Sequence, residues 1–240
     1  MNDSASRGPT RHGVLGHGVV FDATGTLIET TESVGESYRR IALRFDVDLP
    51  AWRLEDGFRR VLRHAPVRGT DGETPEARRQ GEVAWWFEII RQTFQATDST
   101  VRFADFPAFA TALFDAYREG SAWRVRDGMR DVLEAVRAAE IPIAVISNFD
   151  HRLPDVLEAL GIEHYFRSVI LPSATGSAKP ERGPFEAAAE ALSCPLAQLI
   201  YVGDDANDRL EKIADYGVHV VDIRTLENSA ELTDQLLSGR

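Results

Sequence analysis

Short apolar runs alternate with amphipathic segments through the second half of the chain. The run at 141–146 has the length and composition of a buried strand, and a segment with helical spacing follows it. We expect strands at the run that ends at Asp22 and at 141–146, 168–171, 199–202 and 218–223, with helices at 131–139, 152–160, 184–192 and 206–214. Because this alternation is typical of parallel strands with crossover helices, it predicts an α/β fold whose sheet is covered on both faces.

A different pattern occupies residues 31–120. Apolar residues recur there at helical spacing, and no strand-like alternation appears. We expect helices at 33–45, 53–64, 83–94 and 106–117, and a polar loop at 65–76. The chain therefore divides into a disordered leader (1–13), a core built from 14–30 and 121–240, and an all-helical insertion (31–120).

Composition and charge limit the kind of partner. The chain has 240 residues, 43% of them hydrophobic, and a formal net charge of −11. This charge argues against a basic surface for nucleic acid or anionic membranes, and no apolar run approaches the roughly 18 residues of a membrane span. With one cysteine, Cys194, and no secretory signal, we expect an inert thiol and a cytoplasmic location.

Polar residues stand where the expected strands end. Asp22 closes the first strand, Asp204 closes a later one, and Ser147 and Asn148 follow the strand between them. Because the carboxyl ends of parallel strands meet at one edge of a sheet, we expect these side chains to lie close together. Two carboxylates at that edge would suit a divalent cation.

Four stretches carry a resemblance to a known family: FDATGTL, VISN, AKPERGPFE and YVGDDANDR, in this order. In them the chain resembles the haloacid dehalogenase-like superfamily, from Val14 to the last expected strand. The resemblance implies a three-layer, Rossmann-like parallel sheet with a helical cap inserted after the first strand. The Trp85–Trp86 region and the run at 146–150 further resemble the type-three branch of hydrolase-domain-containing proteins.

The resemblance also implies roles in phosphoryl transfer. Asp22 would be the nucleophile and would form an aspartyl-phosphate. Ser147 would hydrogen-bond a phosphoryl oxygen with the Asn148 amide beside it, and Lys179 would bridge the phosphoryl group and Asp22. The expected substrate is a small phosphorylated metabolite, and the expected assembly is a monomer or a weak homodimer.

A Mg²⁺ ion is implied at the same edge. Its ligands would be the carboxylates of Asp22 and Asp204 and the backbone carbonyl of Thr24. Asp208, one helical turn after Asp204, would support the ligands from behind. We expect the neighbouring Asp205 to face elsewhere and to be solvated.

Thr24 departs from the family's pattern. Most phosphatases of the superfamily carry there an aspartate that protonates the leaving oxygen and later activates water, which a hydroxyl cannot do near neutral pH. We therefore expect a weak or specialised hydrolase. Two alternatives stay open: a non-catalytic relative that binds a phosphorylated metabolite or a partner, and, third, a metal-free 2-haloacid dehalogenase.

The helical insertion holds an aromatic stripe of Trp85, Trp86 and Phe94. Such a stripe either lines a substrate cleft or forms the core of the insertion itself. We expect the core, because large aromatic side chains dominate buried helix faces.

Overall fold

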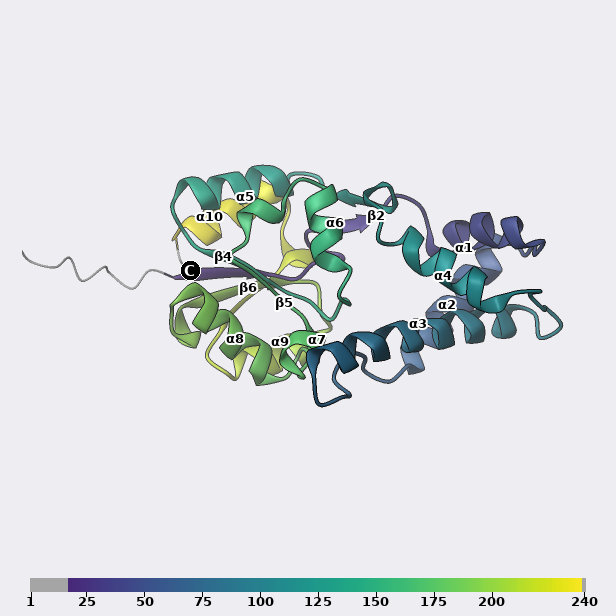
Figure 1. Cartoon of the computed structure of the whole chain (residues 1–240). Coiled ribbons are helices and arrows are strands. Elements are labelled where there is room, and N and C mark those ends of the chain that lie inside the picture. Colours follow the sequence, from purple (N-terminus) through teal and green to yellow (C-terminus); the bar gives the residue numbers. More distant parts are fainter. Residues whose placement is uncertain (1–16, 239–240) are drawn as a thin grey trace, which may run out of the picture.

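The computed structural model describes residues 17–238, so the expected leader at 1–13 lies outside the described residues. Its centre is a five-stranded parallel sheet with the order β5-β4-β1-β6-β7 (Figure 1). Its strands are β1 (Gly18–Phe21), β4 (Ile143–Ile146), β5 (Ser168–Ile170), β6 (Leu199–Gly203) and β7 (His219–Asp222). The expected α/β fold class is therefore confirmed.

Helices cover both faces of this sheet (Figure 1). On one face lie α5 (Met129–Ala138), α6 (Leu153–Ala159) and α10 (Ser229–Ser238), and on the other α8 (Arg182–Leu192) and α9 (Asn207–Ala214). Because successive strand side chains point to opposite faces, Phe21 belongs to the first buried cluster and Val20 to the second. The short helix α7 (Pro172–Thr175) leads towards α8.

Four helices between β2 (Ile28–Thr30) and β3 (Trp123–Val125) form a helical unit to one side of the sheet (Figure 1). They are α1 (Val34–Ala42), α2 (Ala51–His64), α3 (Pro75–Thr97) and α4 (Phe106–Ala116). Side-chain oxygens of Ser33, Thr74 and Asp105 accept hydrogen bonds from the first turns of α1, α3 and α4 and so fix where these helices begin. Their inner faces bury an apolar cluster that includes Leu54, Phe94 and Phe109.

Two features of the fold were absent from the sequence expectations. The strands β2 and β3 pair antiparallel where the chain enters and leaves the helical unit, and α10 packs on α5. Each strand has only three residues, which is too short for a period-two pattern to appear in the sequence. The long-range pairing that forms them therefore leaves almost no local signal.

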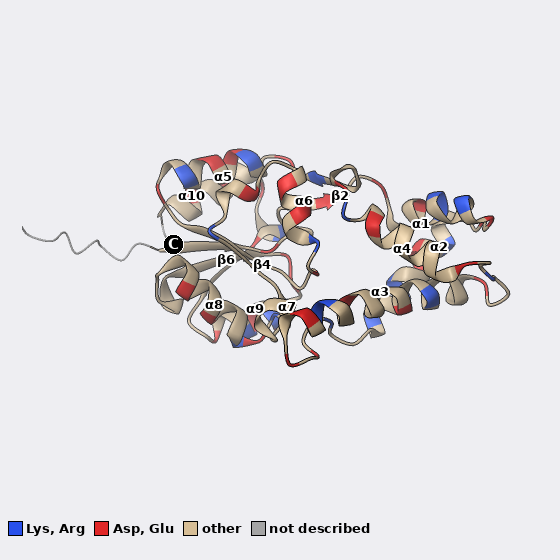
Figure 2. Ribbon diagram, viewed as in Figure 1, with Lys and Arg blue, Asp and Glu red and all other residues tan. Residues whose placement is uncertain are grey.

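Acidic and basic side chains alternate along the outer helices rather than gathering by sign (Figure 2). Within residues 17–238, no helix is both long enough and apolar enough to cross a membrane. Cys194 is buried, and this burial raises the pKa of its thiol, which agrees with an inert side chain.

Candidate functional site

Three neighbouring strands bring the predicted site residues to one edge of the sheet. Asp22 follows β1, Ser147 follows β4, and Asp204 follows β6, and β1 is paired with both of the other strands. Lys179 reaches the same edge from the loop between α7 and α8, and its side chain is almost fully buried. Side chains more than a hundred residues apart in sequence thus share one cluster.

Lys179 is the centre of this cluster. Its Nζ lies 2.8 Å from Asp22 Oδ2 and 3.1 Å from Asp205 Oδ2, and donates a 2.6 Å hydrogen bond to the hydroxyl of Tyr201. The Tyr201 hydroxyl in turn donates to Asp205 Oδ2 over 2.5 Å. An ammonium has three protons, so these three acceptors satisfy it and hold it in a single position.

Asp22 is held from both sides. Its Oδ1 accepts a 2.6 Å hydrogen bond from the backbone N–H of Ala23, while Oδ2 faces Lys179. Burial raises the pKa of the Asp22 carboxyl, Lys179 lowers it and the charge of Asp205 raises it, and the net shift is upward. With 8% of its surface exposed, Asp22 still lines the cleft described below.

The expectation for Asp205 was wrong. Its side chain is 8% exposed and is paired with Lys179 instead of facing solvent. The strand β6 ends at Gly203, so Asp204 and Asp205 lie beyond it. Side chains alternate between faces only within a strand, so this rule does not predict which of the two aspartates points to the site. The sequence also did not predict Tyr201, because a tyrosine within an apolar strand is expected to be a buried core residue.

Tyr201 reaches the site because of a glycine. Side chains two residues apart on a strand share a face, and a Cβ at Gly203 would lie 2.8 Å from the Tyr201 hydroxyl. Because Gly203 has no side chain, the Tyr201 hydroxyl has space to reach Lys179. The ring itself packs against Phe185 in the buried cluster under α8.

Asp204 lies across the turn that follows Asp22. A Cβ at Gly25, whose φ is +84°, would stand 2.1 Å from Asp204 Oδ2, and Thr26 Oγ1 donates a 3.3 Å hydrogen bond to Asp204 Oδ1. Only glycine allows the turn to approach the carboxylate so closely. The structure thus brings Asp204 against Gly25 and the side chain of Thr26.

The oxygens at this edge fit a hard cation. Asp22 and Asp204 offer carboxylate oxygens and Thr24 a backbone carbonyl, which are donors of the kind that Mg²⁺ prefers. The described residues contain no group of three or more His, Cys, Asp or Glu side chains placed to hold a metal. A cation here would therefore depend on two carboxylates, on the backbone and on water, which is usual for Mg²⁺.

Three other predicted residues take different positions. Ser147 is buried, and its Oγ accepts a 3.3 Å hydrogen bond from Phe149 N–H. The Asn148 side chain binds the backbone of Lys179 through both of its ends, at 2.8 and 2.9 Å, and so positions the lysine. Asp208 is exposed on α9, and no hydrogen bond or ion pair joins it to another residue within 17–238.

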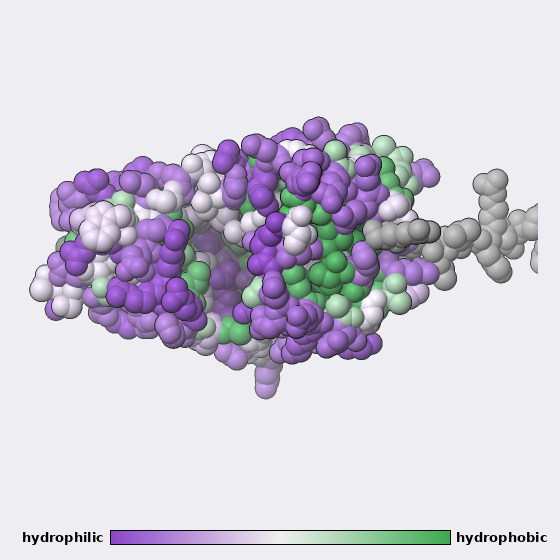
Figure 3. Space-filling view, turned by 180° about the vertical axis from the view of Figure 1, so that it is seen from behind, coloured by the Kyte–Doolittle hydropathy of each residue, from purple (hydrophilic) through white to green (hydrophobic). Residues whose placement is uncertain are grey.

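A cleft of about 330 Å³ opens above the cluster, between the sheet edge and the helical unit. From behind, the hollow between these two parts of the molecule is visible (Figure 3). The sheet side contributes Asp22, Thr24, Ser147, Asn148, Phe149, Lys179, Asp205 and Arg209, and the helical side contributes Val34, Phe58, Leu62, Arg68 and Trp86. Thr24 is exposed in this cleft. Because this residue is a threonine, the cleft has no carboxyl group at the position where most phosphatases of the superfamily carry their acid.

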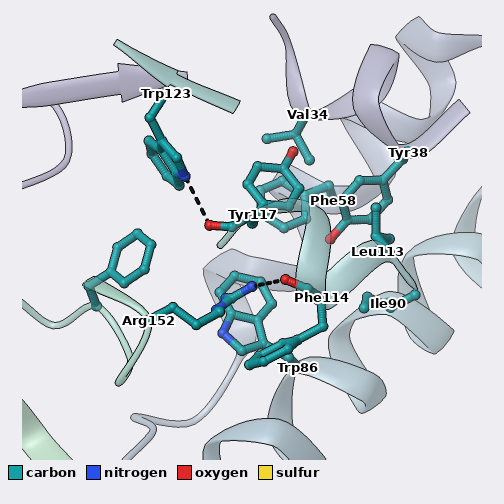
Figure 4. A pocket seen from close by; sticks show the side chains of 11 residues that line it. Val34, Tyr38, Phe58, Trp86, Ile90, Leu113, Phe114, Tyr117, Trp123 and Arg152 are labelled. Atoms are coloured by element: carbon teal, nitrogen blue, oxygen red, sulfur yellow. Dashed lines mark hydrogen bonds between the residues drawn. The ribbon is translucent and has the colours of Figure 1, made fainter. Parts of the chain in front are cut away.

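A smaller apolar cavity of about 60 Å³ adjoins this cleft (Figure 4). Both spaces are lined by Val34, Phe58, Trp86 and Phe149, so these side chains border the cleft and the cavity alike. The expectation that the aromatic stripe only forms the core of the helical unit therefore holds for Phe94 but not for Trp86.

A buried ion pair joins the sheet side to the helical unit beside this cavity. Asp150 has no exposed surface; it is paired with Arg152 at 2.7 Å and accepts a 2.6 Å hydrogen bond from Trp86 Nε1. Arg152 also donates to the Phe114 carbonyl (Figure 4). Burial alone would raise the pKa of the Asp150 carboxyl, but its hydrogen bonds and the charge of Arg152 hold it well below its usual range.

Comparison with known proteins agrees with this geometry. A family model described as haloacid dehalogenase-like hydrolase matches residues 17–210. Haloacid dehalogenase-like hydrolase domain-containing protein 3 of Homo sapiens is 31% identical over 192 residues, which cover 78% of this chain and 73% of that protein. Both findings confirm the resemblance drawn from the four motifs, including the type-three branch.

Solved structures show the same fold at lower identity. L-2-haloacid dehalogenase from Xanthobacter autotrophicus superposes with a TM-score of 0.61 at 19% identity, over 94% of this chain and 84% of that one. A HAD phosphatase from Thermococcus onnurineus gives a TM-score of 0.56 at 16% identity, over 88% and 89%. One architecture thus serves proteins described as a dehalogenase and as a phosphatase.

Proposed function

Because the chain belongs to the haloacid dehalogenase-like hydrolase family, we propose that it is a Mg²⁺-dependent phosphatase for a small organic phosphate. The observation that carries the proposal is the buried Lys179 ammonium, 2.8 Å from Asp22 Oδ2 on the floor of a cleft. A carboxylate held against a fixed cation, yet open to a ligand, suits a nucleophile that attacks phosphorus.

The reaction takes place in two displacements. A carboxylate oxygen of Asp22 attacks the phosphorus, and the bond to the ester oxygen breaks with its electron pair on the departing alkoxide, which takes a proton from water. Water then attacks the same phosphorus, the bond to Asp22 breaks, and inorganic phosphate leaves with the carboxylate restored. Lys179 offsets the negative charge that accumulates in both steps, and Asn148 holds the lysine backbone in place.

The local charge supports a divalent cation. Asp22 and Asp205 share the Lys179 ammonium, and Asp204 lies across the turn that follows Asp22, so the sheet edge carries three carboxylates around one buried ammonium. Arg68 and Arg209 add positive charge to the lining of the cleft. Asp22, Asp204 and the Thr24 carbonyl would hold Mg²⁺, which would offset the three carboxylates where a phosphate dianion approaches.

The threonine at position 24 determines how fast we expect the phosphate ester to be hydrolysed. No acid stands where the leaving oxygen needs a proton, and loss of such a group typically costs on the order of 10²–10⁴ in rate. Substrates with good leaving groups therefore react best, and the aspartyl-phosphate is long-lived. The second candidate function, favoured by the same exposed Thr24, is a relative that binds a phosphorylated ligand without turning it over.

A dehalogenase remains the third candidate. The fold is shared with a dehalogenase, but Asp204 and Asp205 beside Asp22 disfavour a carboxylate next to the reacting carbon. A cytoplasmic location and a monomeric or weakly dimeric state stay predictions of the sequence.

The test compares the wild type with Asp22→Asn, using p-nitrophenyl phosphate and acetyl phosphate with Mg²⁺. We expect the variant to lose at least about 10³-fold in kcat/KM, and chelation of Mg²⁺ to abolish turnover by the wild type. Equal residual activity in both proteins contradicts a phosphatase. Stabilisation by phosphate without turnover would favour the binding protein, and halide release from 2-chloropropionate would favour the dehalogenase.

A further inference from the structure

Arg68 lies in the wall of the cleft that belongs to the helical unit. It comes from the loop between α2 and α3 and lines the same cleft as Asp22 and Lys179. Its guanidinium carbon lies 4.7 Å from the centre of the Trp86 ring and 4.9 Å from that of Trp85. Cation–π contacts with both rings hold the guanidinium against Trp85 and Trp86.

This guanidinium has no anionic partner in the part of the chain that the structure describes. No hydrogen bond or ion pair of Arg68 occurs within residues 17–238, and its Nε is buried without an acceptor. Burial lowers the pKa of the guanidinium, the charge of Asp150 raises it and that of Arg152 lowers it. Arg68 as a whole is only partly buried, so the cost falls on its buried, unsatisfied Nε, and a ligand that supplies an anionic acceptor to the guanidinium would offset it.

Neither neighbouring carboxylate pairs with Arg68. Asp150 is paired with Arg152, and Glu82 Oε2 accepts from both the backbone N–H and Nδ1 of His151, while Glu82 Oε1 is buried without a partner. Neither carboxylate comes within ion-pair distance of Arg68, although the charges of both act on its pKa. Within residues 17–238 the Arg68 guanidinium is therefore left open to an anion carried by a ligand.

The missing anion is distinct from the group that reacts at Asp22. Lys179 pairs with Asp22 and Asp205 on the sheet side, whereas Arg68 packs on Trp85 and Trp86 on the helical side. Arg68 and Lys179 thus belong to opposite walls of one cleft. Phe58, Trp86 and Phe149 line both this cleft and the apolar cavity.

We infer that the substrate is a phosphate monoester whose organic part is apolar or aromatic and carries a carboxylate, which Arg68 binds. This inference rests on the proposed function and specifies its substrate class. A guanidinium presents two parallel N–H groups to a carboxylate, and the Trp86 face accommodates a flat apolar group beside it. A cleft of about 330 Å³ is at the lower end of the sizes that small-molecule sites take.

The test is a calorimetric binding measurement on the full chain carrying Asp22→Asn, in which turnover is blocked, with Mg²⁺ present. The probes are phenyl phosphate and 4-carboxyphenyl phosphate, which differ only by the carboxylate. We expect the carboxylated probe to bind about tenfold tighter, the gain of one charge-assisted bidentate contact. Adding Arg68→Gln removes this preference and leaves the affinity for phenyl phosphate within about twofold.

Two further variants separate binding from folding. Arg68→Lys keeps the charge but not the fork, so we expect it to retain part of the preference. Arg63→Gln removes an exposed arginine of α2 and leaves the preference unchanged. Melting temperatures of all variants check that the fold survives.

The inference is overturned by three results: no preference for the carboxylated probe, equal loss of both probes in Arg68→Gln, or no binding of either probe. Turnover by the wild type is measured separately. A carboxylate preference without turnover that depends on Asp22 would contradict the proposed phosphatase alone, and turnover without the preference would contradict the role of Arg68 alone.

Discussion

The two walls of the cleft are built in opposite ways. On the sheet side, Asp22, Asp205 and Tyr201 all meet the Lys179 ammonium within 2.6 to 3.1 Å. On the helical side, the surface is aromatic, and Arg68 carries a charge with no partner in residues 17–238. The Lys179 cluster on the sheet side is already paired and only the proposed Mg²⁺ would be added to it, whereas the charge on the helical side is left to be paired by a ligand.

In this account the sheet side carries out the reaction, and the helical side selects the substrate. Charged groups that are already fixed stabilise a transition state without reorganising, so the sheet edge suits chemistry on a phosphoryl group of any ester. The helical wall contributes shape and one vacant cation, which discriminate between organic parts. The Asp150–Arg152 pair with Trp86 is one place where the two walls are joined, and the contact of Glu82 with His151 is another.

The largest expected effect comes from breaking that junction. Arg152→Gln leaves the Asp150 carboxylate buried without its cation, so we expect a loss of about 3–5 kcal/mol in the free energy of unfolding. Denaturant unfolding of the purified protein measures it. A loss below 1 kcal/mol would mean that the two walls do not depend on this pair.

An exposed ion pair provides the matched control, and pH provides a second test. Arg118→Gln removes the partner of Asp155, and about 1 kcal/mol or less should be lost. Since Arg152 holds the folded-state pKa of Asp150 below its unfolded value, the pair stabilises the wild type fully above about pH 4. The difference between wild type and Arg152→Gln should therefore shrink as the pH falls below about 4.

The second largest effect concerns Thr24, on the sheet side. Thr24→Asp restores a carboxyl at the exposed position above Asp22, so we expect kcat to rise by about 10²-fold, most for esters with poor leaving groups. Steady-state rates with an alkyl and an aryl phosphate measure this. If the variant binds Mg²⁺ and gains nothing, the missing acid does not limit the enzyme.

The smallest effect distinguishes two aspartates. Asp205→Asn removes a charge that holds Lys179, and we expect kcat to fall about tenfold, whereas Asp208→Asn on the exposed face of α9 should change it less. Steady-state kinetics of both variants, with the melting temperature as a check on folding, give the comparison. A larger loss at Asp208 would favour the roles that the sequence resemblance implied.

The sequence predicted most of the fold because its elements have strong local signals. Buried strands such as β4 are continuous apolar runs, and the helices of the helical unit begin at residues such as Ser33 and Asp105 that accept from the first turn. The strands β2 and β3 were not predicted, because three residues are too few to show the alternation of apolar and polar positions that marks a strand. Their existence depends on pairing across the whole helical unit.

The site was predicted in part for a similar reason. Strand ends converge by topology, which placed Asp22, Ser147 and Asp204 at one edge, and the family resemblance added Lys179 from the loop between α7 and α8. Which way a side chain turns after a strand is decided by packing. Asp205 and Tyr201 joined the cluster through such turns, and Gly203 made room for the tyrosine. Arg68 sits in a polar loop whose sequence gives no sign that it folds over the cleft.

The most direct test of the central claim is detection of the covalent intermediate. Wild-type protein is mixed with acetyl phosphate and Mg²⁺, quenched in acid and analysed by peptide mass spectrometry. We predict one added phosphoryl group on Asp22, persisting for longer than in Thr24→Asp because water is not activated. No adduct under these conditions, or an equal adduct in Asp22→Asn, would contradict the account.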